Sequence, residues 1–584
     1  MLQKLKPYWK ALPNIFCYQI LTKAIIMVWI IVLREAFYLL LKGTGRVALT
    51  SGDFVFLFQS WQGILILALG LVSLYIYAAL DLNAKVALSR QLVCGGAERV
   101  SITKCLKEGL DAPRRMTCLR GIGVVLYIAL IAPLLGFGVS FSLTKGLYIP
   151  TFIASAIKDS TILLVLFIVV MLSFLALGVA NLFILHGVVL DRLPVKEASA
   201  QSRQLVGGNW KDYFKQNVLL LGVIVVGLAA VIAVAILIPL ALISVLPLSA
   251  GVSRVLTILF VIGGTCLSAL ADLFGIPLYL MKMTQLFYTY KQGEPYEYRI
   301  RPSREHPYVK VGVGLAIALL VAMVILVDLN FDKVFPLESN VKVIAHRGGG
   351  SEGAENTLAG FETAWKAGAY GSETDIQRTK DGYYILNHDK NFKRVAGDKR
   401  APEEMTLEEI QSLSVDGEPV PTLDEVLDYC KGRLVLFIEL KGATADQQMA
   451  DDAVKAIRAQ GMEDACVLVS LKYDLMDYIE ETYPDIHTGF LTFATFGNTS
   501  LLNSDYLGLE EESATSDTIS AIHRQDKKVL VWTVDEERSQ RRFLCSDVEG
   551  IITDQVSQAV RIQRNLLQRS DLERMVDRLI GILS

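Results

Sequence analysis

Long apolar runs separated by short polar segments fill the first 332 of the chain's 584 residues. A run of roughly 20 apolar residues is long enough to cross the hydrocarbon core of a bilayer as a helix. The sequence therefore predicts an all-α polytopic membrane domain over residues 1–332, with about seven helices. These predicted spans are residues 18–41, 61–80, 119–142, 161–190, 217–246, 254–281 and 309–328.

From residue 341 the pattern changes to short apolar strands that alternate with helical segments such as 355–368 and 445–461. This alternation is typical of parallel strands joined by helical crossovers, and the length suits a closed eight-stranded α/β barrel of the TIM type. The candidate strands are residues 341–346, 370–376, 383–388, 434–440, 465–471, 487–493, 505–509, 528–534 and 550–553. Because there are nine candidates, we expect one of them to lie outside the barrel.

Charge is distributed unevenly between the two parts. Residues 1–332 carry 29 Lys and Arg against 16 Asp and Glu, which leaves 28 basic and 44 acidic residues for the remainder. With the N-terminus inside, the inner loops of the membrane part hold 22 basic residues and the outer loops hold 5. Basic residues are retained in cytoplasmic loops. We therefore expect a cytoplasmic N-terminus, seven crossings, and an extracellular barrel.

The membrane part contains a short internal echo, SRQLVCGG at residues 89–96 and SRQLVGG at residues 202–208. It indicates either a duplicated unit of a span and an amphipathic segment, or a generic helical segment used twice. Both copies fall in predicted cytoplasmic loops.

Ionisable residues interrupt the apolar strands of the second part near their C-terminal ends, where barrel enzymes place their functional side chains. In chain order these residues are His346, Arg347, Glu373, Asp375, His388, Asp389, Glu439 and Lys441. Glu373 and Asp375 are two residues apart and therefore point to the same side of their strand. Together with Glu439 they offer the oxygen ligands that a hard divalent cation, Ca²⁺ or Mg²⁺, prefers.

The ordered set of motifs resembles the glycerophosphodiester phosphodiesterase family. The motifs are HRG (346–348), ENT (355–357), ETD (373–375), TKDG (379–382), HD (388–389), ELK (439–441), VWTV (531–534) and ITD (552–554). The multi-span first part also looks like the membrane domain attached to some bacterial members. Ala354 and Val556 stand where the family commonly has proline, which affects loop stiffness and leaves the reactive groups in place.

The resemblance implies a metal-dependent hydrolysis of glycerophosphodiesters to glycerol 3-phosphate and an alcohol. It makes His346 and His388 the acid/base pair, and Arg347 a phosphate-binding group. It assigns the metal to Glu373, Asp375 and Glu439. The chemistry agrees, because a phosphodiester anion needs its developing charge neutralised, and imidazoles can accept and donate protons near neutral pH. In this family a free glycerol hydroxyl attacks phosphorus, and water opens the cyclic phosphate.

Four further residues keep two interpretations each. Lys441 either holds phosphate or orients Glu439, and Trp532 either packs the barrel or lines the glycerol pocket. Glu355 is either a charge favoured near a helix N-terminus or a further carboxylate of the site. Asp389 is expected to fix its loop or the neighbouring imidazole.

The expected partners are a glycerophosphodiester or lipid-linked substrate and membrane lipids, with no nucleic acid; a homo-oligomer stays open. The sequence predicts three parts: the membrane domain, the barrel over residues 333–556, and a C-terminal amphipathic helix over residues 557–584 that packs on the barrel, the membrane or another subunit. The membrane domain either anchors the barrel or handles a lipid-linked substrate, a role favoured by Arg34, Glu35, His186 and Asp272 in or near the predicted spans.

Two other functions use the same pattern. The barrel could serve as a glycerophosphate-binding module for a lipid-handling transporter or sensor, but none of the expected ligands or histidines is missing. A phosphodiesterase for phosphoinositides or sphingomyelin would share the architecture, but ETD, ELK and TKDG together are less expected there.

Overall fold

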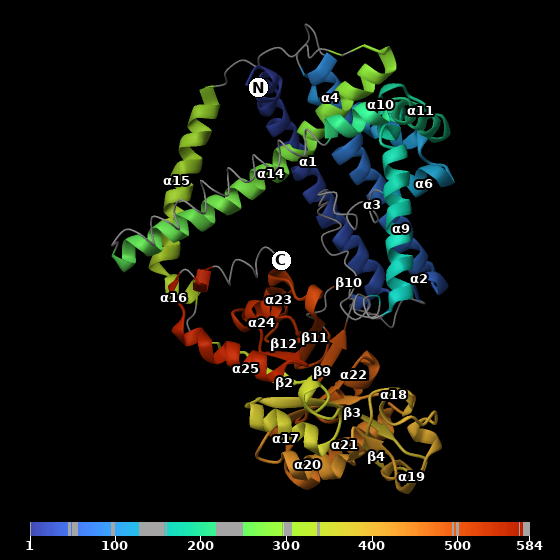
Figure 1. Cartoon of the computed structure of the whole chain (residues 1–584), viewed down its shortest axis with the longest axis vertical. Coiled ribbons are helices and arrows are strands. Elements are labelled where there is room, and N and C mark those ends of the chain that lie inside the picture. The colour runs from blue at the N-terminus through green and yellow to red at the C-terminus, as the bar shows by residue number, and fades with distance from the viewer. Residues whose placement is uncertain are drawn as a thin grey trace. The chain divides into compact units, whose positions relative to one another are not determined.

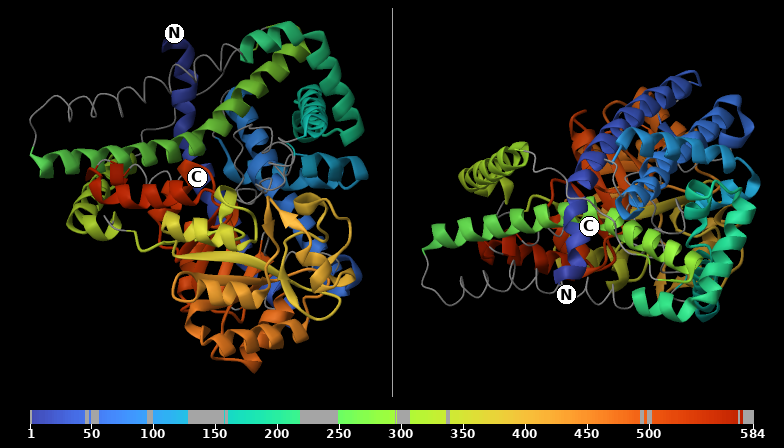
Figure 2. Two further views of the ribbon diagram at one scale, coloured as in Figure 1. Left: turned by 60° about the horizontal axis from the view of Figure 1, so that its bottom comes forward. Right: turned by 90° about the horizontal axis from the view of Figure 1, so that it is seen from above.

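The computed structural model describes residues 2–44, 48–49, 56–94, 100–127, 157, 160–217, 249–294, 296, 307–335, 339–492, 496–497, 502–571 and 573–575. The chain forms two compact units, drawn in Figure 1 and from two other directions in Figure 2. The first comprises Met1–Leu40 and Ser60–Leu329, and the second comprises Leu41–Gln59 and Asn330–Ser584.

The first unit is helical throughout its described residues. Its elements are α1 (Leu2–Lys42), α3 (Trp61–Tyr77), α4 (Ala84–Cys94), α5 (Ile102–Asp111), α6 (Leu119–Leu126), α9 (Thr161–Ala180), α10 (Ile184–Leu190), α11 (Val195–Gly208), α14 (Ala250–Gln292) and α15 (Pro307–Leu329). A single turn, α2 (Phe56–Gln59), precedes α3, and a π-helical segment, Ala78–Asn83, joins α3 to α4. The predicted all-α character is therefore confirmed for the described residues.

Three helical segments among the described residues are long and apolar enough to cross a membrane: Ala11–Lys42, Trp61–Cys94 and Thr161–Leu190. They coincide with three of the predicted spans. Most of the predicted spans 119–142 and 217–246 lies outside the described residues, as does the side chain of Asp272.

The second unit contains the predicted barrel. Its parallel strands are β2 (Lys342–Ala345), β3 (Gly371–Arg378), β7 (Val435–Leu440), β8 (Cys466–Ser470), β9 (His487–Thr492), β11 (Tyr506–Glu510), β12 (Lys528–Trp532) and β13 (Gly550–Thr553). Each strand pairs with the next in this order, and β13 pairs with β2, which closes the sheet. All nine strand candidates are confirmed. The one outside the barrel is β4 (Tyr384–Leu386), which pairs antiparallel with the end of β3.

Helices lie on the outer side of these strands (Figure 1). They are α17 (Leu358–Ala367), α20 (Leu423–Cys430), α21 (Gln447–Gln460), α22 (Tyr473–Thr482), α23 (Ser516–His523), α24 (Glu537–Leu544) and α25 (Val556–Asn565). Local signals set their ends. The Thr357 hydroxyl accepts a hydrogen bond from the Gly360 amide at the start of α17, and Gly368 ends that helix with a φ of 90°, a conformation that favours glycine.

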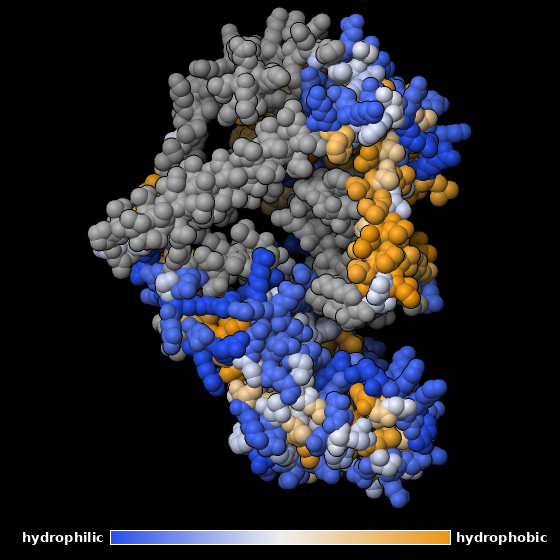
Figure 3. Space-filling model, viewed as in Figure 1, coloured by the Kyte–Doolittle hydropathy of each residue, from blue (hydrophilic) through white to orange (hydrophobic). Residues whose placement is uncertain are grey.

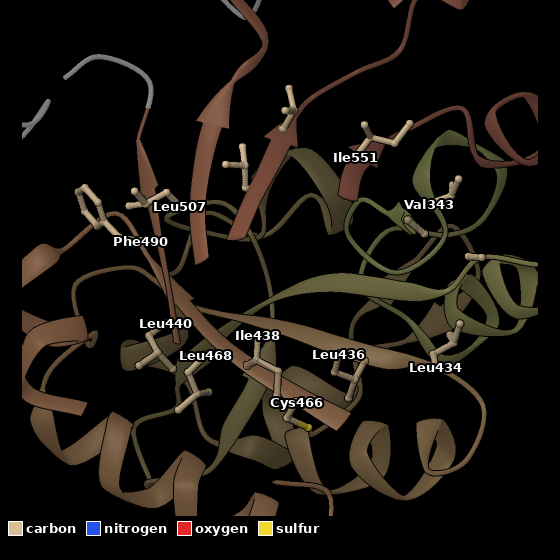
Figure 4. Packing of buried hydrophobic residues seen from close by; sticks show 14 of the residues in the cluster. Val343, Leu434, Leu436, Ile438, Leu440, Cys466, Leu468, Phe490, Leu507 and Ile551 are labelled. Carbon is tan, nitrogen blue, oxygen red and sulfur yellow. The ribbon is translucent and has the colours of Figure 1, made fainter. Parts of the chain in front are cut away.

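Strand residues alternate between two apolar layers, as the period of a β-strand requires. One set faces the helices, including Val343, Leu436, Leu468 and Ile551, which Figure 4 shows on neighbouring strands. The other set fills the barrel interior and comprises Ile344, Phe437, Val467, Val469, Leu491, Leu530 and Ile552. This alternation decides which polar residues point into the barrel.

A short excursion between β4 and β7 has a small core of its own. It contains α18 (Lys393–Ala396), α19 (Leu407–Gln411) and the two-residue strands β5 (Ser414–Val415) and β6 (Glu418–Pro419). Its buried side chains are Ile385, Phe392, Met405, Ile410, Val415 and Val420. The excursion therefore has a defined structure beside the strand ends of the barrel.

Two peripheral segments also belong to the second unit. β1 (Ala48–Leu49), in the segment that follows α1, pairs antiparallel with β10 (Phe496–Gly497). At the other end of the chain, α25 buries Val556, Ala559, Val560 and Ile562 against the barrel. Of the positions predicted for the C-terminal segment, packing on the barrel is thus observed for this part. Remaining elements of the unit include α16 (Phe331–Val334), before β2.

Candidate active site

Three carboxylates meet at the C-terminal rim of the barrel. Glu373 pairs in register with Phe437, which points into the barrel, and Asp375 pairs with Glu439. By alternation all three carboxylates point inward. Their relative exposures are 3%, 0% and 6% for Glu373, Asp375 and Glu439, and one carboxylate oxygen from each lies within 4.8 Å of the other two.

Lys441 contacts two of these carboxylates. Its Nζ lies 2.9 Å from Asp375 Oδ1 and 3.0 Å from Glu439 Oε2, and its side chain is 20% exposed. Burial opposes ionisation of Asp375, but the positive charges of Lys441, His388 and Arg347 outweigh it and hold the pKa of Asp375 below its ordinary value. Lys441 is therefore not a plain surface ion pair, and its contact with Glu439 agrees with the predicted orienting role.

The pKa values of the other two carboxylates, Glu373 and Glu439, are shifted upward instead. Burial and the charge of Asp375 raise the pKa of Glu373 to about 7. Burial, acting against Lys441, raises the pKa of Glu439 to about 8. Burial and mutual repulsion disfavour the ionised form of these carboxylates, and a nearby cation favours it. A cation bound between them would therefore be stabilised. Within the described part of the chain this is the one group of His, Cys, Asp and Glu side chains close enough to share an ion, and its all-oxygen donor set fits a hard divalent cation.

His346 follows β2 directly and lies beside the carboxylate group. Its Nε2 is 4.0 Å from Glu373 Oε2, and its Nδ1 is hydrogen-bonded to Asp554 Oδ1 at 2.9 Å. Asp554 is held in turn, because its amide donates to Asp535 Oδ1 at 2.7 Å. Burial lowers the pKa of His346, but the hydrogen bond to Asp554 and the charge of Glu373 outweigh it and raise that pKa overall.

His388 reaches the same rim by a different route from the one predicted. It does not end a parallel barrel strand, because β4 runs antiparallel to the extension of β3 and folds back toward the rim. The Asn387 amide then donates to the Asp375 carbonyl at 3.1 Å, and Gln377 Nε2 donates to the carbonyl oxygens of Asn387 and Asp389 at 2.7 and 2.8 Å. The hairpin thus delivers the imidazole to Asp375.

Asp389 fixes this imidazole, as expected. Its Oδ1 lies 2.9 Å from His388 Nδ1, and burial, together with the charge of Lys441, holds the pKa of His388 below its ordinary value despite the nearby charge of Asp375. Both site imidazoles therefore engage Nδ1 with a carboxylate. An ionised carboxylate only accepts hydrogen bonds, so in each neutral ring the proton sits on Nδ1 and Nε2 is left to accept one.

Arg347 lies beside the carboxylate group in a left-handed backbone conformation, with a φ of 49°. Its amide donates to Glu373 Oε2 at 2.9 Å, and its Nη1 donates to Glu355 Oε1 at 3.4 Å. Its buried Nε has no hydrogen-bond partner among the described residues. Glu355 thus holds one end of the guanidinium beside the carboxylate group.

Glu355 is bound to two arginines. Besides Arg347, Arg394 donates to both of its oxygens at 2.8 and 2.7 Å. Burial opposes the ionisation of Glu355, but these guanidinium groups hold its pKa below the ordinary value. Of the two interpretations, the contacts favour a carboxylate of the site over a charge that serves only the helix terminus.

Three further side chains bear on the site. Asn356, left without a role by the sequence, donates from Nδ2 to Asp375 Oδ2 at 3.0 Å and accepts from Thr374 at 2.7 Å. Asp554, also without a predicted role, orients His346. Both residues lie in motifs found in the sequence, Asn356 in ENT and Asp554 in ITD. Trp532 packs against the inner apolar layer at the end of β12, and its buried Nε1 has no partner among the described residues.

Comparisons with known proteins match both parts of the chain. The family described as glycerophosphoryl diester phosphodiesterase matches residues 346–558, and the membrane domain of glycerophosphoryl diester phosphodiesterase matches residues 2–324. The glycerophosphodiester phosphodiesterase of Caldanaerobacter subterraneus is 27% identical over 241 residues, which cover 38% of this chain and 97% of the relative. That of Bacillus altitudinis is 28% identical over 242 residues, which cover 38% and 99%.

Solved structures also align with the second part of the chain. A phosphodiesterase from Oleispira antarctica, in complex with the product sn-glycerol-3-phosphate, is 22% identical with a TM-score of 0.36, covering 38% of this chain and 96% of that one. A glycerophosphodiester phosphodiesterase from Parabacteroides distasonis is 24% identical with a TM-score of 0.35, covering 39% and 98%.

Proposed function

This chain belongs to the glycerophosphoryl diester phosphodiesterase family as a membrane-anchored enzyme, and from that premise we propose how its barrel rim hydrolyses a glycerophosphodiester. The products are glycerol 3-phosphate and an alcohol. The observation that carries the proposal is the pair of imidazoles, His346 and His388, each held by a carboxylate at Nδ1 beside three buried carboxylates. The domains act as the sequence divides them, with a membrane part to residue 332, a catalytic barrel over residues 333–556, and the C-terminal segment beyond it.

The two imidazoles exchange protons with the substrate through Nε2. One accepts the proton of the free glycerol hydroxyl as that oxygen forms a bond to phosphorus. The other donates a proton to the alcohol oxygen as its bond to phosphorus breaks, which leaves a cyclic phosphate. Water then opens the ring with the two roles exchanged, so that both imidazoles end in their starting states.

Glu373, Asp375 and Glu439 would hold a divalent cation, Ca²⁺ or Mg²⁺. When bound, that ion neutralises the negative charge that develops on the phosphoryl oxygens. The guanidinium of Arg347, held by Glu355, binds a non-bridging phosphate oxygen. Lys441 orients Glu439 and adds positive charge beside it. Trp532, at the end of β12, contributes apolar surface to the glycerol site.

Product analysis tests this mechanism. Purified full-length protein is incubated with glycerophosphocholine, a lysophospholipid and polyglycerophosphate, with and without a chelator, and glycerol 3-phosphate is assayed. We expect release from at least one diester, loss of release in the chelator, and recovery when Ca²⁺ or Mg²⁺ is restored. Release that persists in the chelator, or hydrolysis that yields no glycerol 3-phosphate, would contradict the proposal.

The barrel works at the outer membrane surface. The distribution of basic residues supports this location, and the pairing of β1 with β10 agrees with the predicted number of crossings. Strands can pair only on one side of a membrane, and the predicted topology places six spans, an even number, between residues 49 and 496. An outward site favours envelope substrates such as lysophospholipids, deacylated headgroups or teichoic-acid polyglycerophosphate. Protease added to intact cells should remove the barrel, and a barrel protected until lysis would reverse the orientation.

The membrane domain serves as an anchor. Arg34 and Glu35, which could have marked a buried polar site, pair with each other at 3.0 Å with side chains that are 59% and 58% exposed. His186 is buried, with its Nε2 3.1 Å from the Thr284 hydroxyl. Cleavage at a protease site introduced near residue 337 separates the two roles. An anchor predicts that the released barrel hydrolyses soluble and lipid diesters in the same ratio as before. Selective loss of the lipid reaction would indicate that the membrane domain handles the substrate.

A further inference from the structure

We propose that Arg394, on the excursion between β4 and β7, is a positioning residue for the reaction, an inference that rests on the proposed function. Its guanidinium spans two carboxylates. Nε and Nη2 donate to Asp389 at 2.8 and 3.3 Å, and Nη1 and Nη2 donate to Glu355 at 2.8 and 2.7 Å. Arg394 thus joins Glu355, in the segment after β2, to Asp389, in the segment after β4.

Each of these carboxylates also contacts a residue that is proposed to meet the substrate. Asp389 Oδ1 lies 2.9 Å from His388 Nδ1, and Glu355 Oε1 lies 3.4 Å from Arg347 Nη1. A continuous chain of contacts therefore runs from the imidazole through Arg394 to the phosphate-binding guanidinium. The planar fork of arginine suits this task, because bidentate contacts to carboxylates define direction as well as distance.

The excursion supplies a rigid base for Arg394. Phe392, two residues earlier, is fully buried with Met405 and Ile410 in the excursion's own core. This packing holds α18, which carries Arg394. The Arg394 side chain is 50% exposed, and ion pairs in water contribute little to stability. Its contribution is therefore expected in the geometry of the site rather than in the free energy of unfolding.

Arg400 offers a matched control in the same excursion. Its guanidinium is 46% exposed and also joins two carboxylates, Asp398 at 2.7 Å and Glu409 at 2.9 Å. Neither of these carboxylates contacts a proposed site residue in the described structure. The variants Arg394→Gln and Arg400→Gln therefore remove equivalent ion pairs. They differ in that only the carboxylate partners of Arg394 contact site residues.

Steady-state kinetics of the full-length variants test the inference. We expect Arg394→Gln to lower kcat by about tenfold, the effect typical of residues that orient a catalytic group, with KM within a factor of two and an unchanged melting temperature. Arg400→Gln should keep wild-type kcat. Because Arg394 and Asp389 act in one chain, Arg394→Gln should cost much less in an Asp389→Asn background.

Three results would overturn the inference: wild-type kcat in Arg394→Gln, equal losses in Arg394→Gln and Arg400→Gln, or fully multiplicative effects in the double variant. If Arg394→Gln fails to fold, Arg394→Lys gives the answer, because a single ammonium cannot span both carboxylates and kcat should still fall. His388→Ala, assayed in parallel, separates the two hypotheses. Near-normal activity there, and in His346→Ala, defeats the proposed function, whereas an inactive His388→Ala with a fully active Arg394→Gln defeats only this inference.

A second inference comes from the first unit and does not depend on catalysis: we infer that a groove between α9 and α11 binds one anionic phospholipid. The groove encloses about 440 Å³, within the range of small-molecule sites. Its lining is apolar except for one arginine and consists of Leu172, Leu175, Ala176, Val179, Ala180, Arg203, Val206 and Gly207. Figure 3 shows the apolar surface over α9.

Arg203 is the charge that selects the ligand. In the other copy of the SRQLV echo, Arg90 is neutralised by Glu108 at 2.7 Å. Arg203 is exposed, its Nε donates to the Ser199 carbonyl at 3.3 Å, and no acidic partner contacts it among the described residues. A cation at the edge of an apolar groove complements a phosphate headgroup above an acyl chain. The equivalent positions of the echo therefore carry different functions.

The residues that follow α11 have the character of a bilayer interface. Trp210 and Phe214 are 58% and 64% exposed, and Lys211 and Lys215 alternate with them along the chain. Aromatic and basic side chains of this kind concentrate at the headgroup level of membranes. Asp212 is engaged by the Tyr290 hydroxyl at 3.0 Å. The surroundings therefore place the headgroup of the bound lipid beside Arg203.

Native mass spectrometry of full-length protein in detergent tests this site with phosphatidylglycerol and phosphatidylcholine as probes. We expect preferential retention of phosphatidylglycerol, reduced about fivefold by Arg203→Gln, and lost for both lipids in Ala176→Phe, which fills the groove. Arg114→Gln, at an arginine whose side chain is 85% exposed in the same unit, should behave as wild type. Equal retention of the two lipids, no effect of Arg203→Gln, or displacement by excess glycerol 3-phosphate would overturn the inference.

Discussion

The strand β8 and the helix α9 are both apolar, yet one is buried and the other is not. All five residues of β8, Cys466–Ser470, are buried, whereas no residue of α9, Thr161–Ala180, is buried in the described structure. The barrel therefore removes its apolar side chains from water by packing, and the helix of the membrane domain offers them to lipid. The apolar character of both segments predicts that they avoid water. It does not predict whether protein or lipid covers them.

The two regions also differ in how their charged groups are compensated. In the barrel, Glu373, Asp375 and Glu439 are at most 6% exposed, although burying a carboxylate is costly unless a partner compensates. In the membrane domain, the paired side chains of Arg34 and Glu35 stay more than half exposed, and the buried Lys85 and Asp81 neutralise each other in a pair of 2.6 Å. At the barrel rim, by contrast, three buried carboxylates lie close enough to share an ion, and Lys441 contacts only two of them. This excess of buried carboxylates over their basic partner is a mark of chemistry.

The largest effect is expected at the imidazoles. His346→Ala and His388→Ala should each lower kcat by roughly 10²-fold or more, because each removes a proton donor or acceptor. The control is His487→Ala, since His487 also pairs with a carboxylate, Asp505 at 2.6 Å, but lies at the start of β9, away from the rim. Steady-state assays with a soluble diester measure all three variants, and near-normal activity of both site variants would refute the assignment.

Equal truncations on β8 and α9 should separate packing from lipid exposure. Leu468→Ala removes a side chain that is fully buried in the barrel, and we expect a loss of roughly 2–5 kcal/mol in the free energy of unfolding. Leu166→Ala removes one that is 56% exposed, and its cost should stay within about 0.5 kcal/mol. Heat inactivation of diesterase activity reports the barrel. Similar losses of unfolding free energy for the two variants would contradict the difference in burial between β8 and α9.

A smaller effect is expected where a carboxylate only orients an imidazole. Asp554→Asn removes the charge that holds His346 at Nδ1, and we expect kcat to fall about tenfold with little change in KM. Asp505→Asn makes the same change at the partner of His487 and should leave kcat unaltered. If the two variants lose activity equally, the loss reflects general stability and not the orientation of His346.

The smallest effect concerns stability in a chelator. Glu373 and Glu439 have ordinary pKa values near 4.5, raised to about 7 and about 8 by burial. Between about pH 4.5 and pH 8 the folded state therefore binds more protons than the unfolded state, so the metal-free barrel loses stability as pH rises through this window. We expect its melting temperature to be several degrees lower at pH 8.5 than at pH 6.

Saturating Ca²⁺ or Mg²⁺ should reduce this pH dependence, because the ion replaces the protons. The double variant Glu373→Gln/Glu439→Gln should lack it, because neither side chain titrates. A wild-type melting temperature that rises over the same interval in the chelator would contradict the direction of both pKa shifts. Differential scanning fluorimetry across the pH series measures all of these cases.

Much of the barrel was predictable because its signals are local. Apolar runs bounded by polar turns located every barrel strand, and the capping residue Thr357 with Gly368 marks the ends of α17. The two-residue strands β5, β6 and β10 were missed, because a two-residue pairing leaves no periodic pattern. The place of β4 was left undecided as well, since an antiparallel hairpin and a parallel strand share the same alternation.

The candidate site was predictable in its residues but not in its connections. The alternation of side chains places Glu373 and Asp375 on one face, and the motifs pointed to His346 and His388. The partners of those histidines required the fold. His487 and His523 also contact carboxylates, Asp505 and Glu549, so a nearby acidic residue does not by itself distinguish a site imidazole.

The sequence by itself determined that this protein has a membrane half and an α/β half, and which side chains interrupt the barrel strands. Tertiary structure decided that Asp554 meets His346 across 208 positions of the chain, because closure of the sheet makes the last strand the neighbour of the first. It also decided that His388 reaches Asp375 by a hairpin that folds back on β3. Periodicity acts over a few residues, whereas contacts between distant segments depend on how the strands close around the core.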